Sequence, residues 1–407
     1  MQSQIKNTAS GIIFIAMPLA GFPFFKFYFC VSRSKLAWIH EMRIQGKEFQ
    51  TIWTQKRGTG PVYIIDQTRL PSEFRVQKLQ SCRDAFRSIR NMQVRGAPLI
   101  GVAAAYGIAL AFRETAFRRD WRNLLESRFA MLEASRPTAV NLTRALQILR
   151  PLLQCCENVE AAEITAWKYA RDLRESEIAA CSAIGDHGLP LIETIAASKK
   201  GEPVNILTHC NAGWLACVDW GTALAPVYKA WRKGIPLHVW VDETRPRLQG
   251  ARLTAYELQE EGIAHTLITD NAGGHLMQSG KVDLLLTGSD RTSRCGDVCN
   301  KIGTYLKGLA ARENGIPFYV ALPLSSIDLQ IRNASEIPIE ERSQEEVLFI
   351  ESKRRKLRIA TPGTPAANPG FDITPAQLVS GLITERGICP ATEAGIRAIM
   401  EDPDHAA

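Results

Sequence analysis

A cysteine and an aspartate stand out because each directly follows a predicted buried strand, a position from which side chains often reach a ligand. Cys210 comes after the apolar run 204–208 and before Asn211-Ala-Gly and a stretch compatible with a helix. Amides at the start of such a helix would stabilise a thiolate. A cysteine also often packs as a small buried hydrophobe, so a purely structural role for Cys210 stays open.

Asp290 ends the segment Val282-Asp-Leu-Leu-Leu-Thr-Gly-Ser-Asp, in which three leucines lead towards the aspartate. Apolar surroundings raise the pKa of a carboxyl group, so Asp290 is a candidate acid near neutral pH. Two other roles fit the local sequence equally well. They are the capping of a following helix and an ion pair with Arg291.

Three short basic segments are candidate anion sites. Arg95-Gly-Ala-Pro precedes an apolar helical run, in which Gly96 permits close backbone approach and Pro98 suits the first turn of a helix. An arginine beside a helix N-terminus is suited to binding phosphate. Arg136 and the pair Asn300-Lys301 are candidates of the same kind, although each alone also fits a solvated turn.

The ten cysteines are irregularly spaced and do not form the compact framework of a small secreted domain, so we expect a reducing compartment, the cytoplasm. Cys295 and Cys299 are four residues apart and would share a helical face, and Cys155 adjoins Cys156. No histidine stands at metal-ligand spacing beside either pair. We therefore expect packing cysteines and no metal site.

The composition allows a large core. The chain has 407 residues, of which 45% are hydrophobic and 22% charged, and its length suggests two or three domains. The net charge of +7 is scattered and forms no dense basic stripe. We expect no nucleic-acid partner, whereas an anionic small molecule fits.

The elements that would position these residues change in character along the chain. Short β-type runs between residues 49 and 70 predict a hairpin. Helical spacing of apolar residues then recurs in four segments: 84–92, 99–115, 121–135 and 139–156. After residue 203, five apolar runs alternate with helical sequence: 204–208, 238–241, 265–269, 282–286 and 318–322.

This order predicts an α/β fold, with a mostly helical N-terminal domain that carries a small β hairpin, followed by a Rossmann-like domain with a largely parallel sheet. Ligands in such sheets bind beyond the carboxyl ends of the strands. The expected parts are a mostly helical domain, 42–165, one or two connecting helices, 166–202, a Rossmann-like catalytic domain, 203–390, and a C-terminal tail, 391–407.

The first 41 residues differ from the rest. Residues 11–32 are strongly apolar, which is compatible with a signal or membrane-anchor helix, but Pro18, Pro23 and Lys26 interrupt the run. We interpret residues 1–41 as an apolar extension outside the fold and expect no membrane association.

Taken together, the motifs resemble the methylthioribose-1-phosphate isomerase family, which is related to the regulatory subunits of the translation-initiation exchange factor. The resemblance spans about residues 45–387. It rests on Val94-Arg-Gly-Ala-Pro-Leu-Ile-Gly, Ser135-Arg-Pro-Thr, Thr208-His-Cys-Asn-Ala-Gly, Asp242-Glu-Thr-Arg-Pro-Arg-Leu-Gln-Gly, Gly288-Ser-Asp-Arg, Asn300-Lys-Ile-Gly-Thr and Asn368-Pro-Gly-Phe-Asp-Ile-Thr.

The resemblance implies an aldose-ketose isomerase of methionine salvage that acts on 5-methylthioribose 1-phosphate, forms a homodimer and uses no cofactor. It implies that Cys210 and Asp290 are catalytic. It also implies substrate contacts from seven residues: Arg95, Gly96, Ala97, Arg136, Gln249, Asn300 and Lys301. Ser289 stands where family members often have alanine, a departure that touches no mapped functional side chain.

The implied reaction needs an acid to open a phosphorylated sugar ring and a group that moves hydrogen from C2 to C1. Our assignment is Asp290 as the acid and Cys210 as the base, with exchanged roles and a hydride shift left open. Trp214 and nearby leucines are expected to exclude water. The alternatives are an isomerase for a ribose 1,5-bisphosphate, which needs a more cationic pocket, and a non-catalytic regulatory subunit, which has no use for Cys210 and Asp290.

Overall fold

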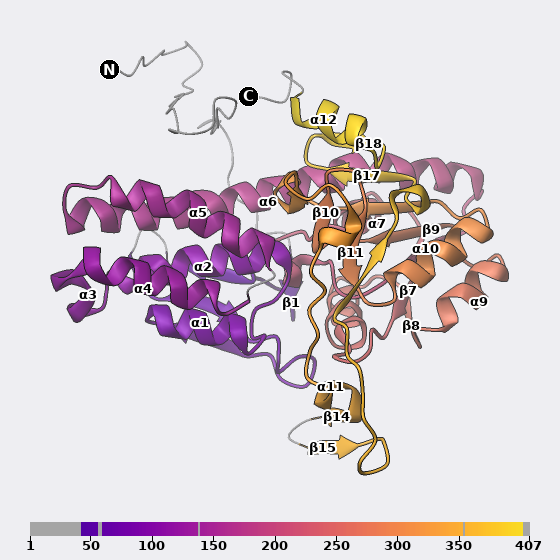
Figure 1. Ribbon diagram of the computed structural model, residues 1–407. Helices are drawn as coiled ribbons and strands as arrows, with labels where there is room; N and C mark the ends of the chain where they lie inside the picture. The colour runs from indigo at the N-terminus through magenta and orange to yellow at the C-terminus, as the bar shows by residue number, and fades with distance from the viewer. Residues whose placement is uncertain (1–41, 56–58, 137–138, 353–354, 402–407) are drawn as a thin grey trace.

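The chain folds into a helical half and a sheet half that one long helix joins (Figure 1). The computed structural model describes residues 42–55, 59–136, 139–352 and 355–401. The predicted apolar extension, 1–41, and the end of the predicted tail, 402–407, lie outside the described residues. The predicted α/β fold class is confirmed, because a helical region precedes a mostly parallel sheet.

Short antiparallel strands begin the helical half. They are β1 (Arg43–Ile44), β2 (Lys47–Glu48), β3 (Ile52–Thr54), β4 (Val62–Ile65) and β5 (Val76–Leu79). The predicted hairpin is β3 and β4, and β5 adds a third strand that was not predicted. Ile52 pairs with Ile64 and both are fully buried, so one face of this small sheet belongs to the core.

Five helices follow: α1 (Cys82–Arg90), α2 (Ala97–Ala111), α3 (Thr115–Arg119), α4 (Trp121–Glu133) and α5 (Val140–Gln154). Among them α1, α2, α4 and α5 confirm the four predicted helical segments. Every residue of α2 after Ala97 is buried, because α1, α4 and α5 surround it. Alanine and glycine dominate α2, and such small side chains let helices pack closely around it.

A single helix, α6 (Val159–Ser198), stands where one or two connecting helices were predicted. The side chain of Asn158 caps it by accepting a hydrogen bond from the amide of Ala161 at 2.9 Å. Its first half packs on α2, where Trp167 lies 6.1 Å from Tyr106 between ring centroids. Its second half packs on α7 (Ala225–Arg232), so α6 belongs to both halves of the molecule.

The sheet half is built on a seven-stranded sheet with the order β18-β17-β12-β9-β6-β7-β8. All neighbours are parallel except β17 and β18. Five strands confirm the predicted runs: β6 (Val204–Thr208), β7 (Leu237–Asp242), β8 (His265–Ile268), β9 (Leu284–Thr287) and β12 (Phe318–Ala321). Two were not predicted: β17 (Gly381–Thr384) and β18 (Gly387–Cys389).

Helices cover both faces of this sheet. Helices α6 and α7 pack on one face, and α9 (Ala272–Gln278) and α10 (Thr304–Glu313) pack on the other. Alternate residues of β6 reflect this arrangement, since Ile206 belongs to the first core cluster and Leu207 to the second. Helix α8 (Ala255–Glu260) packs on β8, and α12 (Glu393–Glu401) packs on β18.

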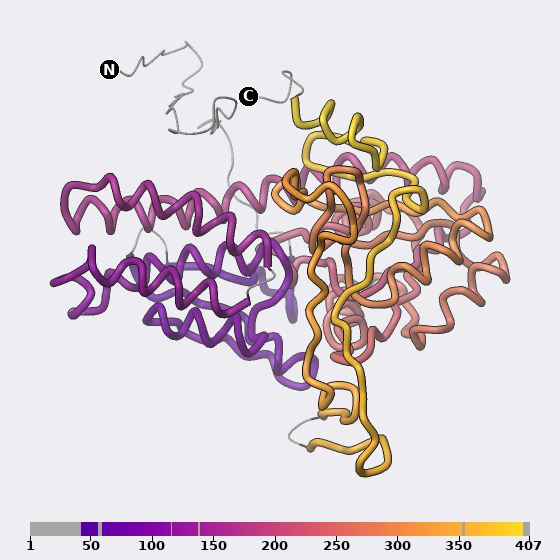
Figure 2. Tube along the Cα trace, viewed as in Figure 1, coloured from indigo at the N-terminus to yellow at the C-terminus, as the bar shows by residue number. Residues whose placement is uncertain are grey.

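A second, four-stranded sheet lies beside the main sheet and was not predicted. Its order is β13 (Ile327–Asp328), β10 (Arg291–Ser293), β11 (Val298–Lys301) and β16 (Phe371–Thr374). Between β13 and β16 the chain forms an arm that ends in α11 (Glu345–Leu348), β14 (Phe349–Ser352) and β15 (Arg355–Arg358). Figure 2 shows this arm projecting from the lower side of the molecule.

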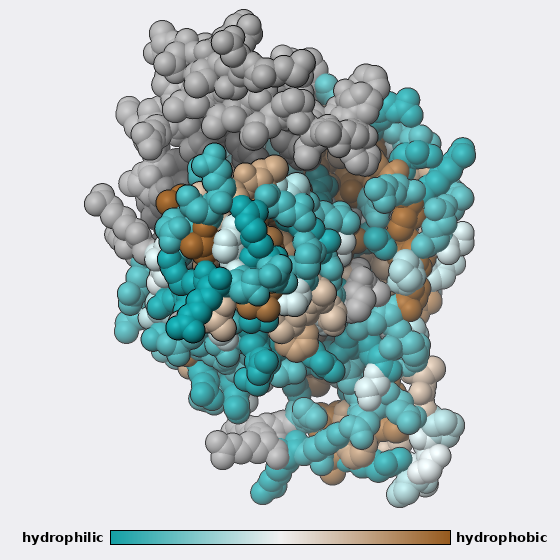
Figure 3. Space-filling view, turned by 60° about the vertical axis from the view of Figure 1, so that its left-hand side comes forward, coloured by the Kyte–Doolittle hydropathy of each residue, from teal (hydrophilic) through white to brown (hydrophobic). Residues whose placement is uncertain are grey.

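Short helical turns complete the described chain: η1 (Trp214–Ala216), η2 (Gly250–Thr254), η3 (Leu324–Ser326), η4 (Ala334–Glu336) and η5 (Ala376–Leu378). The face in Figure 3 is mainly hydrophilic, with apolar residues in small groups. Among the described helices, none combines the length and the apolar character that crossing a membrane requires.

We predict that Gly188→Ala destabilises the fold. An added Cβ would lie 2.4 Å from Cγ of Pro226, so α6 would have to move away from α7. Overpacking of this kind costs about 1–3 kcal/mol. The urea concentration at the unfolding midpoint should therefore fall.

The matched control is Gly274→Ala in α9, where an added Cβ meets only Cβ of Ala310 at 3.6 Å. Alanine is a better helix former than glycine, so this variant should gain about 0.5–1 kcal/mol. A Gly188→Ala midpoint at or above that of the wild type would contradict the tight packing of α6 on α7.

Candidate active site

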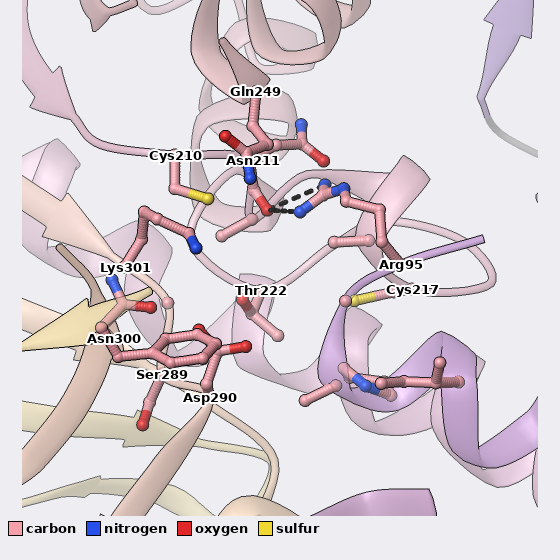
Figure 4. A pocket seen from close by; sticks show the side chains of 18 of the residues that line it. Arg95, Cys210, Asn211, Cys217, Thr222, Gln249, Ser289, Asp290, Asn300 and Lys301 are labelled. Carbon is pink, nitrogen blue, oxygen red and sulfur yellow. Dashed lines mark hydrogen bonds between the residues drawn. The ribbon is translucent and has the colours of Figure 1, made fainter. Parts of the chain in front are cut away.

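All nine predicted site residues line one cavity of about 60 Å³. The cavity lies at the carboxyl ends of β6 and β9 and against the N-terminus of α2. Figure 4 shows the thiol of Cys210 and the carboxyl group of Asp290 pointing into the same space. A single small molecule can therefore contact both groups.

Cys210 follows β6 in a strained backbone conformation. Its φ of 64° lies in the left-handed region, which non-glycine residues rarely adopt outside functional sites and turns. Two threonines hold the residue, because the hydroxyl of Thr244 accepts from its amide at 2.9 Å and that of Thr254 donates to its carbonyl at 2.7 Å. The backbone of Cys210 is thus positioned by side chains from a distant segment.

The helix predicted to follow Cys210 is absent. The chain instead continues as a loop and the short turn η1, and α7 begins only at Ala225. A single amide, that of Asn211, lowers the pKa of the thiol. Burial has the larger effect and raises the pKa of Cys210, as does Asp290, while Arg95 and Lys301 lower it. The net shift is upward, so the thiol favours its protonated form.

Asp290 has neither of the alternative roles that its local sequence allowed. No helix follows it, because the chain enters β10, and Arg291 pairs with Asp328 at 2.9 Å. Burial raises the pKa of Asp290 above its ordinary value, against the opposing effects of Lys301, Arg136 and Arg95. The carboxyl group therefore keeps its proton to a higher pH than an exposed aspartate does.

Arg95 is almost fully buried and is held rigidly at the cavity. Both terminal nitrogens of its guanidinium donate to the carbonyl of Asn211 at 3.0 Å, and Nε donates to Gln67 at 3.3 Å. The next residue, Gly96, has a φ of 95° and lies against the backbone of Ala216, where a Cβ would be 2.2 Å from the carbonyl oxygen. Glycine is required there because any side chain would separate α2 from the loop after Cys210.

Arg136 and Gln249 offer unpaired polar atoms at the cavity. Arg136 donates to Glu340 at 3.3 Å and contacts the sulfur of Met92 at 3.2 Å, but its buried Nε has no partner among the described residues. The buried Oε1 of Gln249 is also without a partner there. A bound polar molecule would satisfy such atoms, whose burial without a partner is costly.

Asn300 and Lys301 lie on β11 and are buried, so a solvated turn is the wrong interpretation for this pair. The ammonium group of Lys301 donates to the carbonyl of Gly370 at 2.8 Å and lies 4.5 Å from the ring centre of Phe371. Burial lowers the pKa of Lys301. Asn300 donates to Thr304 at 3.0 Å.

Several residues that line the cavity were not predicted. They are Met92, Pro98, Ile100, His209, Asn211, Ala212, Ala216, Cys217, Thr222, Gly288, Ser289, Pro323 and Phe371. His209, Asn211 and Phe371 stand inside recognised motifs, which was a usable signal, whereas Met92 and Thr222 come from turns with no such signal. Trp214 was expected to exclude water, but it is buried in the core and does not line the cavity.

His209, Asp242 and Asp270 form the one group of described residues with ligand atoms close enough to hold a metal ion. The ammonium group of Lys307 already lies 2.9 Å from a carboxylate oxygen of Asp242 and donates to the carbonyl of Asp270 at 2.9 Å. His209 contacts the same carboxylate oxygen at 2.8 Å. Because the protein supplies its own cation, these residues fit an internal ion-pair network and do not fit a metal ion.

The nine cysteines of the described residues are all free thiols. Cys299 lies on β11 and Cys295 in the turn before it, so the shared helical face expected for this pair is wrong. Neither cysteine lines the cavity.

Comparison with known proteins finds similarity over most of the chain. Residues 93–391 match the model of the initiation factor 2 subunit family. The chain is 53% identical over 372 residues to methylthioribose-1-phosphate isomerase of Methylorubrum populi, which covers 90% of this chain and 100% of that protein. It is also 53% identical over 368 residues to the protein of the same name from Sinorhizobium medicae, covering 89% and 100%.

Two solved structures are similar in fold and sequence. Crystal structure form II of 5-methylthioribose 1-phosphate isomerase from Pyrococcus horikoshii has a TM-score of 0.77 and 38% identity, covering 87% of this chain and 96% of that one. The structure of translation initiation factor eIF-2B, subunit delta, from A. fulgidus has a TM-score of 0.74 and 38% identity, covering 87% and 100%.

We predict that the thiol of Cys210 is alkylated by iodoacetamide with a pH midpoint above its ordinary value of 9.0, because burial raises its pKa. Asp290→Asn removes a negative charge that raises this pKa, so the midpoint should move to lower pH. Mass spectrometry of the peptide that carries Cys210 measures the rate, and the exposed Cys155 is the internal reference. A midpoint that stays or rises in Asp290→Asn would contradict the coupling of the two groups.

Proposed function

The chain belongs to the initiation factor 2 subunit family and to its methylthioribose-1-phosphate isomerases, and from this premise we propose how its cavity performs that reaction. The enzyme is an aldose-ketose isomerase of methionine salvage that converts 5-methylthioribose 1-phosphate to 5-methylthioribulose 1-phosphate. The observation that carries the proposed chemistry is one cavity shared by Cys210, Asp290 and three cationic side chains.

We propose that Arg95, Arg136 and Lys301 bind the phosphate group of the substrate. Each is a cation at the cavity wall, and Arg136 keeps a buried N–H without a partner among the described residues. Phosphate binds such cations through charge-assisted hydrogen bonds. The backbone at Gly96 and Ala97, at the N-terminus of α2, adds amides that attract an anion.

The substrate also needs a place for its uncharged methylthio group. The cavity offers one, which favours this substrate over a sugar bisphosphate. Met92, Ile100, Pro323 and Phe371 give the cavity an apolar wall. A second phosphate would need further cations, whereas the described lining of the cavity contains no arginine or lysine besides the three assigned to the first phosphate. An apolar wall stabilises a methylthio group by removing it from water.

Ring opening requires an acid because the anomeric oxygen carries the phosphate and cannot release a free aldehyde. We assign this role to Asp290, whose raised pKa lets it hold its proton to a higher pH than an exposed aspartate does. Its proton goes to the ring oxygen while the bond between C1 and that oxygen breaks, and the electron pair of the bond stays on the oxygen. The phosphate-bearing oxygen shares electrons with the cation left at C1.

Hydrogen then moves from C2 to C1. The thiolate form of Cys210, which Arg95 and Lys301 favour against the net upward shift of its pKa, takes the proton from C2. The electron pair of that bond forms a double bond between C1 and C2. Cys210 returns the proton to C1 while ionised Asp290 takes the proton of the 2-hydroxyl group, which leaves a carbonyl at C2. Both groups end in their starting states, so the cycle is balanced. Arg95 and Lys301 support the thiolate by lowering the pKa of Cys210.

The reaction also balances if Asp290 and Cys210 exchange roles. It balances as well if hydrogen moves directly from C2 to C1 as a hydride. Exchange with solvent separates the last route from the others. A proton carried by a protein group exchanges with water, whereas a hydride that shifts within the substrate does not.

A regulatory subunit without turnover has no need of an acid and a thiol in one cavity. The similarity to an initiation-factor subunit shows that the fold also serves other proteins. The pairing of Cys210 with Asp290 in one cavity favours the enzyme.

We propose that the enzyme forms a homodimer in the cytoplasm. Three large apolar side chains of α10 are exposed and would be covered in a dimer: Tyr305, Leu306 and Leu309. The free thiols of the described residues suit a reducing compartment.

We predict that Cys210→Ser and Asp290→Asn each lower kcat by at least about 100-fold while the proteins stay folded, since general acid–base groups contribute about 10²–10⁴-fold. The assay follows formation of the ketose phosphate, and circular dichroism confirms folding. The control is Cys389→Ser, which removes a buried cysteine that does not line the cavity. Wild-type-like turnover in either variant would remove that residue from the mechanism.

Turnover in deuterium oxide tests the proton route directly. Transfer through Cys210 should place solvent deuterium at C1 in part of the product, because the thiol exchanges its proton with solvent in a fraction of turnovers. Nuclear magnetic resonance or mass spectrometry measures this fraction. Product without deuterium at C1 would support the hydride shift and contradict the role of Cys210 as proton carrier.

A further inference from the structure

Glu257 in α8 is a buried carboxylate that no step of the proposed reaction uses. Its side chain is only 1% exposed. Its two oxygens accept hydrogen bonds from four donors. Of these, only the hydroxyl of Tyr228 could accept a proton in return, and it would then lose its own hydrogen bond to Glu257. The donors are Nδ2 of Asn211 at 2.9 Å, the amide of Trp214 at 3.0 Å, the amide of Leu215 at 3.1 Å and the hydroxyl of Tyr228 at 2.6 Å.

Three of these donors belong to the loop that follows Cys210. The loop wraps around the carboxylate so closely that a Cβ on Gly213 would lie 1.7 Å from an oxygen of Glu257. A glycine at this position therefore permits the contact. The loop has no regular secondary structure before η1, so side-chain contacts and not a backbone ladder determine its shape.

The same loop connects Glu257 to two groups at the cavity. Asn211 directly follows Cys210, and its carbonyl accepts both terminal N–H groups of Arg95. Its side chain also donates to the hydroxyl of Thr254 at 3.1 Å, and that hydroxyl donates to the carbonyl of Cys210 at 2.7 Å. A shift of Asn211 would thus move Arg95 and Cys210 together.

We propose that Glu257 is a positioning residue of the isomerase, whose ionised carboxylate holds the Asn211–Leu215 loop and thereby places Cys210 and Arg95 at the substrate. This inference rests on the proposed function. Glu257 does not line the cavity, so it acts through Asn211 and not by contact with the substrate.

Protonation of Glu257 weakens this arrangement. Hydrogen bonds to a carboxylate are charge-assisted and about twice as strong as neutral ones. A protonated carboxyl would also have to donate to one of four groups that already donate to it. The hydroxyl of Tyr228 is the only one able to accept, and it would then lose its own hydrogen bond to Glu257.

The change in protonation falls in the range where the enzyme can be assayed. Burial raises the pKa of Glu257 to about 7, while Tyr228, Asn211, the amide of Leu215 and the charge of Arg95 lower it. Arg232 and Glu261, which pair with each other, are the charged groups beside Tyr228. Loss of the carboxylate below this pH predicts an acid limb near pH 7 in the pH profile of kcat, separate from the dependence at higher pH that belongs to Cys210.

Two variants test the proposal through the pH profile of the purified enzyme. Glu257→Gln places an amide against four donors and should lower kcat/KM by about 10- to 100-fold, as expected when reacting groups are misplaced by about 1 Å. Its residual activity should lack the acid limb near pH 7, since glutamine does not titrate, and keep the dependence at higher pH that belongs to Cys210. Tyr228→Phe removes a donor that stabilises the carboxylate, so the acid limb should move to higher pH.

Asp283→Asn is the matched control. The carboxylate of Asp283 also accepts from a backbone amide, that of Asn205 at 2.7 Å, but it lies at the opposite ends of β6 and β9. This variant should leave the acid limb in place even where it lowers stability. Tyr228→Phe removes a single oxygen and keeps the test available if Glu257→Gln does not fold.

The proposal would be overturned by a limb near pH 7 that does not move in Tyr228→Phe or that persists in Glu257→Gln. Alkylation of Cys210 by iodoacetamide provides a readout that does not depend on turnover. Glu257→Gln should change its rate relative to Cys155, whereas Asp283→Asn should not, and equal rates in all three proteins would overturn the proposal. Wild-type protein without isomerase activity would instead refute the proposed function, while the alkylation result still decides the role of Glu257.

Discussion

The site depends on one constraint, which is that the groups proposed to do the chemistry are removed from water. Burial raises the pKa of Cys210 and Asp290 and lowers that of Lys301, so each group is shifted towards its uncharged form. The cations and the acids of the cavity oppose these shifts only in part. A phosphate group bound nearby would add negative charge and raise the pKa of Asp290 further.

The fold provides this environment by bringing three structures to one place. The carboxyl ends of β6 and β9 present Cys210 and Asp290, as expected for a parallel sheet. The N-terminus of the buried helix α2 presents Arg95 and Gly96. The small second sheet adds Lys301 on β11 and Phe371 on β16, so the cavity is closed by residues from both halves of the molecule.

Local pattern was sufficient to predict much of the fold. The runs at β6, β7, β9 and β12 are apolar because both faces of the sheet are largely buried there, whereas β8 is an edge strand without a buried residue. The spacing of α1, α2, α4 and α5 reflects their one-sided or complete burial. The four strands of the second sheet carry no such pattern. β10 reads Arg-Thr-Ser, and β11 pairs with β16, about 70 residues away, so only long-range contacts define them.

The site residues show the same division. Cys210 and Asp290 were identifiable from their positions after strands, but their surroundings were not. Glu257 is distant in sequence from the loop that it contacts, and Arg291 pairs with Asp328 and not with Asp290. The prediction of a helix directly after Cys210 was wrong for this reason. Contacts with a distant carboxylate, and not local propensity, determine the shape of that loop.

The proposed role of Asp290 depends on burial raising its pKa against the opposing charges of Lys301, Arg136 and Arg95. Infrared difference spectra between the wild-type protein and Asp290→Asn, recorded across pH, would report the carbonyl stretch of the protonated carboxyl group. The account predicts a titration midpoint clearly above the ordinary aspartate value of 3.8. A midpoint at or below that value would contradict the role of Asp290 as the acid that opens the ring.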